Sequence, residues 1–419
     1  MRKALVRRAA LLLLFTLTGC VTRETRDVKH EVTPIDSAAS TSFKQETGAL
    51  LSGGYVAGNS IVTYVNGREI FPPMLAAIRS ARRTIDFETY VMWNGEVAHE
   101  FADALSERAR AGVQVNVILD AQGTQKMGGD NLEKLRASGA HVVKYHPLKI
   151  WNPREFNNRT HRKLLIVDGK VGFIGGVGIA DEWQGNGDTP DHWRDNHYKV
   201  TGPVVAQLQG AFMDNWLKTQ NAVLHGPDYF PPLTSTGPYH AQIFWSSPRL
   251  GNMDVHLMYL VAIAAAQHSL LIENAYFMPD ALMRKELIAA AKRGARVEIV
   301  VPGKHIDQKI VRIAQRKYWP ELLRAGVRIF EYQPAMDHTK LMIVDGNFVS
   351  VGSANFDLRT LRLNDEANMN VVDRSFAAQQ ARIFEQDKRR SREITLNSAG
   401  VMGFANPIEQ AASVVAPEL

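Results

Sequence analysis

The sequence contains only one cysteine, Cys20, among its 419 residues. A chain with one cysteine forms no intramolecular disulfide, so the fold must be held together by its core. The chain also lacks an excess of either charge, because its formal net charge is only +6. A small positive charge favours anionic partners such as phospholipid head groups or nucleic acid, but it does not distinguish between them.

No long apolar run stands at the N-terminus. Four basic residues within the first eight positions precede an apolar stretch from Ala9 to Leu17. A helix of that length cannot cross a bilayer core of about 30 Å, and the layout is that of a signal peptide. The stretch leads into Leu17-Thr18-Gly19-Cys20, which resembles the lipobox of bacterial lipoproteins. In such proteins the cleaved chain begins at the cysteine, which carries the acyl chains.

We therefore predict a signal peptide at residues 1–19, followed at residues 20–50 by the lipidated Cys20 and a polar tether. Several acyl chains anchor a protein firmly, so the membrane is an expected partner through Cys20. The expected location is the periplasmic face of the bacterial cell envelope. Val21 follows the cysteine, as in lipoproteins that are sorted to the outer membrane of a Gram-negative host.

The rest of the chain repeats one order of elements. An apolar strand, a helical stretch, a second strand and a hairpin that contains histidine occur in residues 50–225 and again in 240–390. Strands that alternate with helices predict an α/β fold, and the hairpins add antiparallel strands to each sheet. We predict two pseudo-repeated α/β sandwich halves with mixed sheets, at 51–235 and 236–395, with the active site at their interface. Residues 396–419 form an unassigned C-terminal tail.

Each hairpin contains nearly the same nonapeptide, "HRKLLIVDG" at 161–169 and "HTKLMIVDG" at 338–346. Alternate residues of a strand share a face, so each histidine points the same way as the lysine two positions later. The Asp-Gly pair is a hairpin turn signal, and glycine at the end of the returning strand completes a cradle for phosphate. Chance supplies one such spacing in roughly one chain in several hundred, so two copies indicate a function.

These residues resemble the signature of the phospholipase D superfamily, His-x-Lys-x4-Asp-x6-Gly-[Gly/Ser]-x-Asn, which occurs once in each of two halves. The second copy matches throughout, at His338, Lys340, Asp345, Gly352, Ser353 and Asn355. The first copy matches at His161, Lys163, Asp168, Gly175 and Gly176, but it has Gly178 where the family usually has asparagine. The runs "ENAYFMPD" and "NFDLRTLRLNDEANM" narrow the resemblance to bacterial cardiolipin synthases.

The resemblance implies a reaction that needs neither a metal nor a cofactor. His161 would form a phosphohistidine, while His338 would protonate the leaving group and later deprotonate the acceptor hydroxyl. The groups expected around the phosphate are Lys163, Lys340, Asn355, Ser353 and Gly176. The implied substrates are phosphatidylglycerol-like phospholipids, and a monomer is sufficient for one active site.

Four carboxylates accompany the hairpins. A histidine that alternates between base and acid needs an acceptor on its other ring nitrogen, and we predict Asp195 and Glu366 for this role. Both stand where the family carries an acidic residue after the hairpin. Asp168 and Asp345 belong to the catalytic motif. Their positions at turns nevertheless favour a structural role, in which they tie down the hairpins through hydrogen bonds to the backbone.

A metal site is an alternative for one cluster. His192, Asp195 and His197 are residue types that often ligate metals. Asp195 and His197 share a face of the strand that follows, whereas His192 lies too far away, so we expect no metal there.

Two segments could contact lipid or form a solvated rim. The first, "YHPLKIWNPREF" at 145–156, mixes aromatic and basic side chains. The second, "KIVRIAQRKYW" at 309–319, places Lys309, Arg312 and Arg316 on one helical face. An enzyme that transfers lipid must keep water from its intermediate, so we expect an apolar rim made of Ile150, Trp151, Phe156, Tyr276 and Phe277.

Three functions compete. A cardiolipin synthase-like phosphatidyltransferase passes the phosphatidyl group to an alcohol on another lipid, a phospholipase passes it to water, and an exported nuclease acts on nucleic acid. An inactive scaffold is disfavoured because both histidines and both lysines are present. The basic residues are spread among acidic ones, and the anchor at Cys20 would place the site near lipid. We therefore expect transfer between phospholipids and no nucleic-acid partner.

Overall fold

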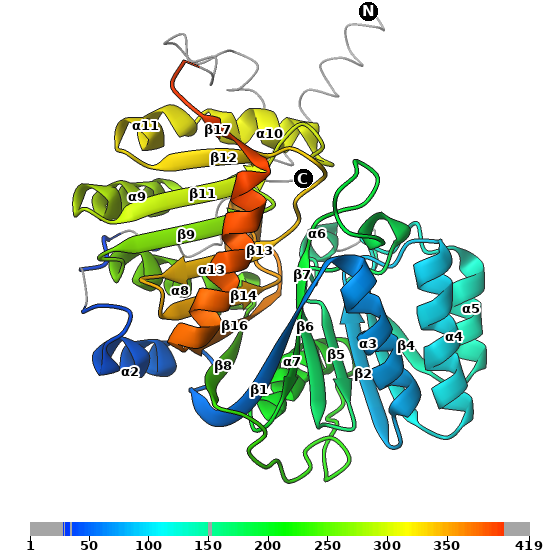
Figure 1. Cartoon of the computed structure of the whole chain (residues 1–419). Coiled ribbons are helices and arrows are strands. Elements are labelled where there is room, and N and C mark those ends of the chain that lie inside the picture. The colour runs from blue at the N-terminus through cyan, green and yellow to red at the C-terminus, as the bar shows by residue number, and fades with distance from the viewer. Residues whose placement is uncertain (1–27, 29, 34–35, 150–152, 398–419) are drawn as a thin grey trace, which may run out of the picture.

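The computed structural model describes residues 28, 30–33, 36–149 and 153–397 (Figure 1). The predicted signal peptide and Cys20 lie outside the described residues, as do Ile150, Trp151 and residues 398–419 of the tail. Within the described part of the chain, no helix combines the length and apolar character needed to cross a membrane.

The first half alternates strands and helices, as the repeat predicted. Its elements are β1 (Val56–Val65), α3 (Asn66–Ser80), β2 (Thr84–Thr89), α4 (Glu96–Arg110), β3 (Gln114–Asp120), α5 (Gly129–Ala137), β4 (His141–Tyr145), α6 (Pro153–Asn157), β5 (Leu164–Val167), β6 (Val171–Gly175), the 3-10 turn η1 (Asp181–Trp183), β7 (Asn196–Thr201) and α7 (Val205–Gln220).

The second half follows the same plan with additions. Its elements are β8 (Tyr239–Ser246), η2 (Pro248–Leu250), α8 (Asp254–Ala264), β9 (Ser269–Asn274), β10 (Phe277–Met278), α9 (Ala281–Lys292), β11 (Arg296–Pro302), α10 (Lys309–Arg316), α11 (Trp319–Arg324), β12 (Arg328–Tyr332), β13 (Lys340–Val344), β14 (Phe348–Gly352), β15 (Phe356–Asp357), α12 (Leu358–Arg362), β16 (Glu366–Val372), α13 (Arg374–Arg389) and β17 (Ser391–Ile394).

The sheet order repeats from one half to the other. From the centre outward, the first half runs β7-β6-β5-β2-β3-β4 and the second runs β16-β14-β13-β9-β11-β12. The strands β2, β3 and β4 are parallel, whereas the hairpin of β5 and β6 is antiparallel, and the second half has the same arrangement. The predicted fold class, mixed α/β with two pseudo-repeated halves, is confirmed.

The two halves share one sheet, which the sequence did not predict. β8 pairs with β16 and β1 pairs with β7, and β8 and β1 then pair with each other to make a sheet of 15 strands (Figure 1). The edge strand of each half offers unpaired N–H and C=O groups, and mutual pairing satisfies some of them. The β1–β8 register shifts between Val56 and Asn59.

The three largest apolar clusters among the described residues pack against this sheet. One packs α3 and α4 against the first half, and another packs α8 and α9 against the second. The third core contains Phe212 of α7, Phe376 of α13 and strand residues from both halves. Because burial of apolar surface drives folding, this shared core fixes the two halves against each other.

The predicted tether is wrong where it overlaps α2 (Thr41–Leu50). Ser40 caps this helix by accepting the Phe43 N–H at 3.0 Å. Phe43 is fully buried, and its ring lies 5.1 Å from that of Phe348. The segment therefore packs on the second half, where Ala38 and Leu51 join Phe43 in the same apolar core.

Both Asp-Gly turns form the hairpins that the sequence predicted. Asp168 and Asp345 have φ angles of 51° and 50°, and Gly169 also has positive φ, which is the geometry of tight hairpin turns. Asp168 accepts the Arg83 N–H at 2.7 Å and the Thr84 N–H at 3.0 Å. Asp345 binds the backbone ahead of β9 in the same way. These bonds tie each hairpin to the start of a neighbouring strand.

A buried ion pair also joins the halves behind the site. Arg194, just before β7, is 1% exposed, and its guanidinium contacts Asp387 of α13 at 2.7 Å. The carboxyl groups of Glu273 and Asp337 interact with the same arginine. Burial and the charge of Asp387 raise the pKa of Asp337 to about 6. Arg194 is thus the counterion for several buried acids.

Replacing Arg194 with methionine should lower the free energy of unfolding by about 3–5 kcal/mol, because the buried acids lose their counterion. Without that charge the already raised pKa of Asp337 rises further, so the loss should be larger at pH 8 than at pH 5. Denaturant unfolding at the two pH values measures both effects. The control is Arg83→Met, since Arg83 is 72% exposed and lies 3.9 Å from Asp228. Equal losses in both variants would contradict the assignment.

Candidate active site

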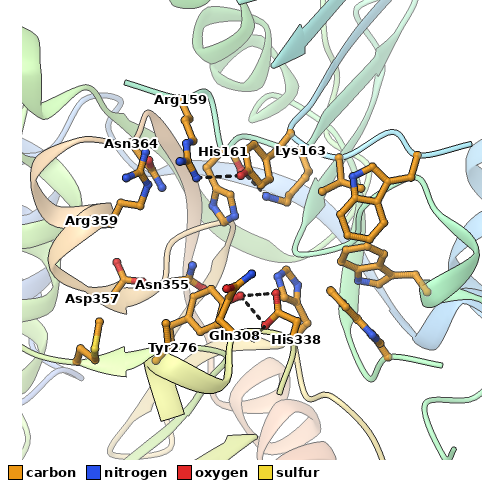
Figure 2. A pocket seen from close by; sticks show the side chains of 18 of the residues that line it. Arg159, His161, Lys163, Tyr276, Gln308, His338, Asn355, Asp357, Arg359 and Asn364 are labelled. Atoms are coloured by element: carbon orange, nitrogen blue, oxygen red, sulfur yellow. Dashed lines mark hydrogen bonds between the residues drawn. The ribbon is translucent and has the colours of Figure 1, made fainter. Parts of the chain in front are cut away.

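The two repeated segments meet at one pocket of about 390 Å³. His161 directly precedes β5 and His338 directly precedes β13, and both side chains reach this pocket together with Lys163 and Asn355 (Figure 2). Tying down the Asp-Gly turn at the other end of each hairpin fixes where these side chains lie. The predicted placement of the site between the halves therefore agrees with the structure.

The backbone of each histidine is held by the opposite half. His161 N–H donates to the carbonyl of Asp365 at 2.8 Å, and His338 N–H donates to the carbonyl of Arg194 at 2.7 Å. Each of these carbonyls belongs to the residue just before a buried carboxylate. The same exchange therefore occurs twice, as the repeat of the fold requires.

The side chains cross between the halves in the same way. His161 Nδ1 lies 2.9 Å from Glu366 Oε2, and His338 Nδ1 lies 2.8 Å from Asp195 Oδ2. Asp195 and Glu366 were predicted as imidazole partners, and the structure adds that each binds the histidine of the other half. A carboxylate on Nδ1 leaves Nε2 of each ring to face the pocket.

The residue after the first glycine of the motif differs between the two copies, being Gly176 in the first half and Ser353 in the second. Ser353 Oγ donates to Glu366 Oε2 at 2.6 Å. At the matching position, a Cβ on Gly176 would lie 2.3 Å from a carboxylate oxygen of Asp195, so only glycine leaves room for that acid. Both residues were predicted to lie by the phosphate. Neither lines the pocket, and both act instead on the carboxylate that orients a histidine.

Asp168 and Asp345 also lie away from the pocket walls. Their carboxylates are bound to backbone N–H groups at the far ends of the hairpin strands. Their inclusion in the catalytic set is therefore corrected, and the structural role that their turn positions favoured is the one that the geometry supports.

Both lysines of the motif are buried next to their own histidines. Lys163 Nζ donates to the carbonyl of His161 at 2.7 Å, and Lys340 Nζ donates to the carbonyl of His338 at 2.6 Å. Lys340 Nζ also lies 3.2 Å from His338 Nε2. Burial lowers the pKa of Lys163 to about 7 and that of Lys340 to about 8. An anionic ligand beside these lysines would therefore raise the pKa of both and stabilise their charged forms.

Burial and the lysines also act on the histidines. Burial, followed by the charges of Lys163 and Lys340, holds the pKa of His161 well below its usual range. Burial and Lys340 lower the pKa of His338 to about 3. Both imidazoles are thus neutral near pH 7 in the free protein. An anionic phosphodiester placed between the lysines would offset their charge and raise the pKa of both rings.

The two carboxylates differ in charge state. Burial raises the pKa of Glu366 to about 7, although Lys163 and Ser353 oppose the shift. Burial also acts on Asp195, but the hydrogen bond with His338 and the charge of Lys340 leave the pKa of Asp195 lower than usual. Asp195 is therefore ionised at neutral pH, and it is the better partner for a protonated imidazole.

The structure explains why Gly178 replaces the asparagine of the motif. A Cβ at this position would lie 2.8 Å from the Trp183 ring and 2.9 Å from Val91. Trp183 occupies the space that an asparagine side chain would need, and its Nε1 donates to Asp195 Oδ2 at 3.0 Å. In the second half Asn355 lines the pocket, and its buried Oδ1 has no hydrogen-bond partner among the described residues.

One end of the pocket is aromatic. Trp93, Trp183 and Trp193 line it, and the rings of Trp183 and Trp193 lie 5.2 and 5.6 Å from that of His338. Lys126 Nζ lies 4.5 Å from the Trp93 ring centroid. Tryptophan faces exclude water and accept cations. We call these three tryptophans the tryptophan end of the pocket.

The predicted apolar rim is only partly right. Tyr276 lines the pocket, and its hydroxyl donates to Asp307 at 2.7 Å. Phe277 is fully buried in the core, with its ring 5.2 Å from that of Phe356. Phe156 does not line the pocket. Tyr276 directly precedes β10 and Phe277 begins it, and neighbouring residues of an extended segment point to opposite sides, so both could not reach the site.

Two arginines of the basic face predicted on α10 bind a buried acid. Arg312 and Arg316 contact the buried carboxylate of Glu331 at 2.7 and 3.0 Å. Arg392 of β17 binds the other oxygen of Glu331 at 2.8 Å. The basic spacing therefore satisfies a buried acid, which a helical projection of the sequence alone cannot reveal.

The alternative metal cluster does not assemble. Asp195 binds His338, while His192 Nδ1 lies 3.2 Å from Thr189 Oγ1. Across the described residues there is no group of three or more His, Cys, Asp or Glu side chains that could hold a metal ion. His197 is buried within β7, and burial lowers its pKa to about 3.

The end of the pocket away from the tryptophans is polar and basic, and the sequence did not predict it. Arg159, Arg359 and Asn364 line it and lie together on one side of His161 (Figure 2). Arg159 stands two positions before His161, and the other two occur in the run "LRTLRLND". Their closeness in sequence to the two hairpins was the available signal. Local sequence patterns do not reveal, however, which side chains point into the pocket. We call these three residues the arginine end.

The hairpins of the two halves thus belong to one mixed sheet and exchange imidazole–carboxylate pairs at the pocket. A family model described as "Cardiolipin synthase, PLD-like domain" matches residues 74–188 and 259–388. The chain belongs to this phospholipase D-like family.

Curated relatives support this membership. A cardiolipin synthase of Geobacillus kaustophilus is 35% identical over 306 residues, which cover 72% of this chain and 61% of the relative. Cardiolipin synthase A of Pseudomonas syringae pv. syringae is 33% identical over 347 residues, covering 82% of this chain and 71% of that protein. The chain thus spans less than two thirds of the first of these relatives.

A solved structure supports the fold. The crystal structure of a phosphatidylserine synthase from Haemophilus influenzae matches with a TM-score of 0.67 at 15% identity. The match covers 90% of this chain and 97% of the other. At this identity the likeness establishes a shared architecture, and it does not extend to substrates.

The electrostatics of the site predict the charge of the histidines directly. In the free protein, the NMR signals of His161 and His338 should show neutral rings at pH 6, below the usual imidazole pKa of about 6.5. Replacing Lys340 with methionine removes a positive charge beside His338, so the pKa of His338 should rise. Lys170→Met, at an exposed turn position, is the control and should leave it unchanged. A His338 pKa that stays constant or falls in Lys340→Met would contradict this explanation.

Proposed function

We propose that the protein is a phosphatidyltransferase that passes a phosphatidyl group through a phosphohistidine to a lipid alcohol, as a cardiolipin synthase would. The observation that carries the proposal is the pair of crossed imidazole–carboxylate contacts at one pocket, each beside a buried lysine. The names of the curated relatives agree with it. A single chain supplies both halves of the site, so a monomer is sufficient.

In the first step, His161 Nε2 attacks phosphorus as a neutral nucleophile. Its Nδ1 proton is held by Glu366, which fixes the tautomer that leaves the Nε2 lone pair free. The bond between phosphorus and the leaving oxygen breaks, and His338 gives that oxygen a proton. Asp195, whose pKa is lower than usual, stabilises the imidazolium of His338 before transfer. This difference between the two carboxylates supports His161 as the nucleophile and His338 as the acid.

In the second step, the acceptor hydroxyl replaces the leaving group. Neutral His338 removes the hydroxyl proton, the acceptor oxygen bonds to phosphorus, and the bond to His161 breaks. Lys163, Lys340 and the side-chain amide of Asn355 stabilise the charge on the non-bridging oxygens in both steps. Charged lysines fill the role that a Lewis acid plays in other phosphodiester enzymes, so no step requires a metal or a cofactor.

The tryptophan end supports transfer to an alcohol rather than to water. Trp183 and Trp193 lie next to His338, which activates the acceptor. A largely aromatic wall offers water few hydrogen-bond partners at that position, whereas the carbon chain of an alcohol packs against it. A phospholipase remains an outcome of the test below, as does the nuclease.

We further propose that the protein is exported and anchored to the periplasmic face of the cell envelope through a lipidated Cys20. The N-terminal sequence supports this, since it has the layout of a signal peptide that ends in a lipobox. Anchoring at the outer membrane would place the pocket beside its phospholipid substrates.

The anchor predicts how a Cys20→Ser variant behaves. Without the thiol no acyl chain can be attached, so the variant should persist as an unprocessed or mislocalised precursor. Cell fractionation with detection of precursor and mature protein measures this. Mature Cys20→Ser protein that still fractionates with membranes would show that the lipobox interpretation is wrong.

The reaction itself is tested with purified protein and phosphatidylglycerol vesicles. Cardiolipin and glycerol should form, and a chelator should leave the rate unchanged. His161→Ala and His338→Ala should each lower turnover by about 10³-fold or more, because neither half alone holds both nucleophile and acid. His225→Ala, which changes an exposed histidine, is the control.

The products separate the three functions. Phosphatidic acid without cardiolipin would favour the phospholipase. Cleavage of DNA without any change in the lipids would refute the proposed function, and so would loss of activity with a chelator followed by recovery with zinc.

A further inference from the structure

A buried carboxylate lies next to His161 without lining the pocket. Asp365 is 1% exposed and stands just before β16. Its carbonyl accepts the His161 N–H at 2.8 Å, and its own N–H donates to the carbonyl of Arg159 at 2.9 Å. The next residue, Glu366, binds the imidazole of His161. The position of Asp365 therefore determines where both groups that hold His161 lie.

The side chain of Asp365 is held by several partners. Its Oδ2 accepts the hydroxyl of Tyr145 at 2.8 Å and lies 2.8 Å from the ammonium of Lys218. Its Oδ1 accepts from the side-chain amide of Asn158 at 3.2 Å, and the guanidinium of Arg162 lies 4.0 Å away. These partners belong to β4, α7 and the segment between α6 and β5, all in the first half. A carboxylate of the second half is thus fixed within the first.

Lys218 connects this carboxylate to a packed helix. It lies near the end of α7, and its ammonium also donates to Asp214 Oδ2 at 2.7 Å, Asn215 Oδ1 at 3.0 Å and Ser247 Oγ at 2.7 Å. Its side chain is 16% exposed, so an ammonium with these acceptors around it has little freedom to move. Because α7 packs in the core that the two halves share, Lys218 relates Asp365 to the part of the molecule that sets their spacing.

The other histidine has the same arrangement with the charges reversed. Arg194 stands just before Asp195, its carbonyl accepts the His338 N–H at 2.7 Å, and its guanidinium contacts Asp387 of α13 at 2.7 Å. Helices α7 and α13 hold matching places, because each follows the strand that starts at or just after the buried acid. Each ion pair therefore joins the residue before an acid to a helix of the opposite half. The recurrence of this link indicates a role at both histidines.

Stability alone is a weak reason for such a pair. Burial removes a carboxylate and an ammonium from water, and well-packed apolar side chains in their place are often at least as stabilising. Hydrogen bonds are directional, however, whereas apolar contacts are not. Charged groups with defined hydrogen bonds therefore fix the orientation of a main chain more closely than apolar packing does. Here the oriented main chain is the one that holds His161.

We propose that Asp365 is a positioning residue for His161 and that it acts through its ion pair with Lys218 on α7. This inference rests on the proposed function and explains how the nucleophile of that reaction is aligned. With Asp365 fixed, its carbonyl and the carboxylate of Glu366 hold the main chain and Nδ1 of His161 together. Nε2 of His161 is then directed at phosphorus within the narrow range of geometries that attack allows.

Two measurements on Asp365→Leu test this role. The variant keeps the branched shape of the side chain but removes its charge, and Lys218 retains Asp214 as a partner. In NMR spectra of the free protein, the Nδ1 proton of His161 should shift or broaden, while that of His338 stays unchanged. With phosphatidylglycerol vesicles, kcat should fall about 10- to 100-fold at an unchanged KM, because misplacing a reacting atom slows the reaction without weakening binding.

Further variants separate positioning from a general loss of structure. Lys218→Met should change the His161 signal less than Asp365→Leu, because Asp365 keeps its other partners, and Lys218→Arg should keep most of the rate. Adding Lys218→Met to Asp365→Leu should lower kcat no further, since both act through one contact. The matched control is Asp103→Leu, which removes an ion pair with Lys134 at a carboxylate that is 62% exposed. It should leave kcat and both histidine signals unchanged.

The outcomes distinguish the positioning role from the proposed function. In folded Asp365→Leu, either a wild-type kcat or an unchanged His161 signal would overturn the role. Equal changes at His161 and His338 would also overturn it, because they indicate a general loosening. If Asp365→Leu does not fold, the more exposed Lys218→Met decides, and an unchanged His161 signal there overturns the role. A wild-type protein that makes no cardiolipin would instead refute the proposed function, and the NMR measurement would still decide whether Asp365 positions His161.

Discussion

The structure depends on the exchange of hydrogen bonds between the two halves at the histidines. His161 is bound by the backbone of Asp365 and the carboxylate of Glu366, and His338 is bound by the backbone of Arg194 and the carboxylate of Asp195. Each half therefore carries one imidazole and the group that orients the other. The shared core and the single sheet hold the halves at the spacing that this exchange requires.

Burial sets the chemistry that this exchange can support. In a site from which water is largely excluded, the lysines and histidines lose part of their affinity for protons, and the free protein therefore holds less charge than the residue types suggest. An anionic substrate reverses these shifts, so binding itself would prepare the acid. The pKa of Asp195 is lower than usual and that of Glu366 is higher, so the two halves of the repeat are not chemically equivalent.

The sequence predicted the parts of the fold that depend on local patterns. Alternating apolar residues and Asp-Gly turns located both hairpins, and the repeat gave the mixed α/β halves. The sequence also named Asp195 and Glu366, but their crossing between halves is a long-range contact that no local pattern contains. The shared sheet was missed for the same reason, because β8 and β1 pair across the seam.

The two ends of the pocket show the other limit of sequence reasoning. Trp183 stands five positions after Gly178, and nothing local indicates that its ring fills the space of the missing asparagine. The basic spacing on α10 was conspicuous, yet Arg312 and Arg316 serve a buried acid. Arg359 was less conspicuous and lines the pocket. Burial, rather than residue type, decided which arginines reach the site.

The central claim is that the crossed carboxylates make His161 the nucleophile and His338 the acid. The most direct measurement is to quench the protein during turnover of phosphatidylglycerol and to locate the covalent adduct by mass spectrometry of its peptides. The account predicts a phosphatidyl group on His161 and none on His338. An adduct on His338, or turnover without any adduct on His161, would contradict it.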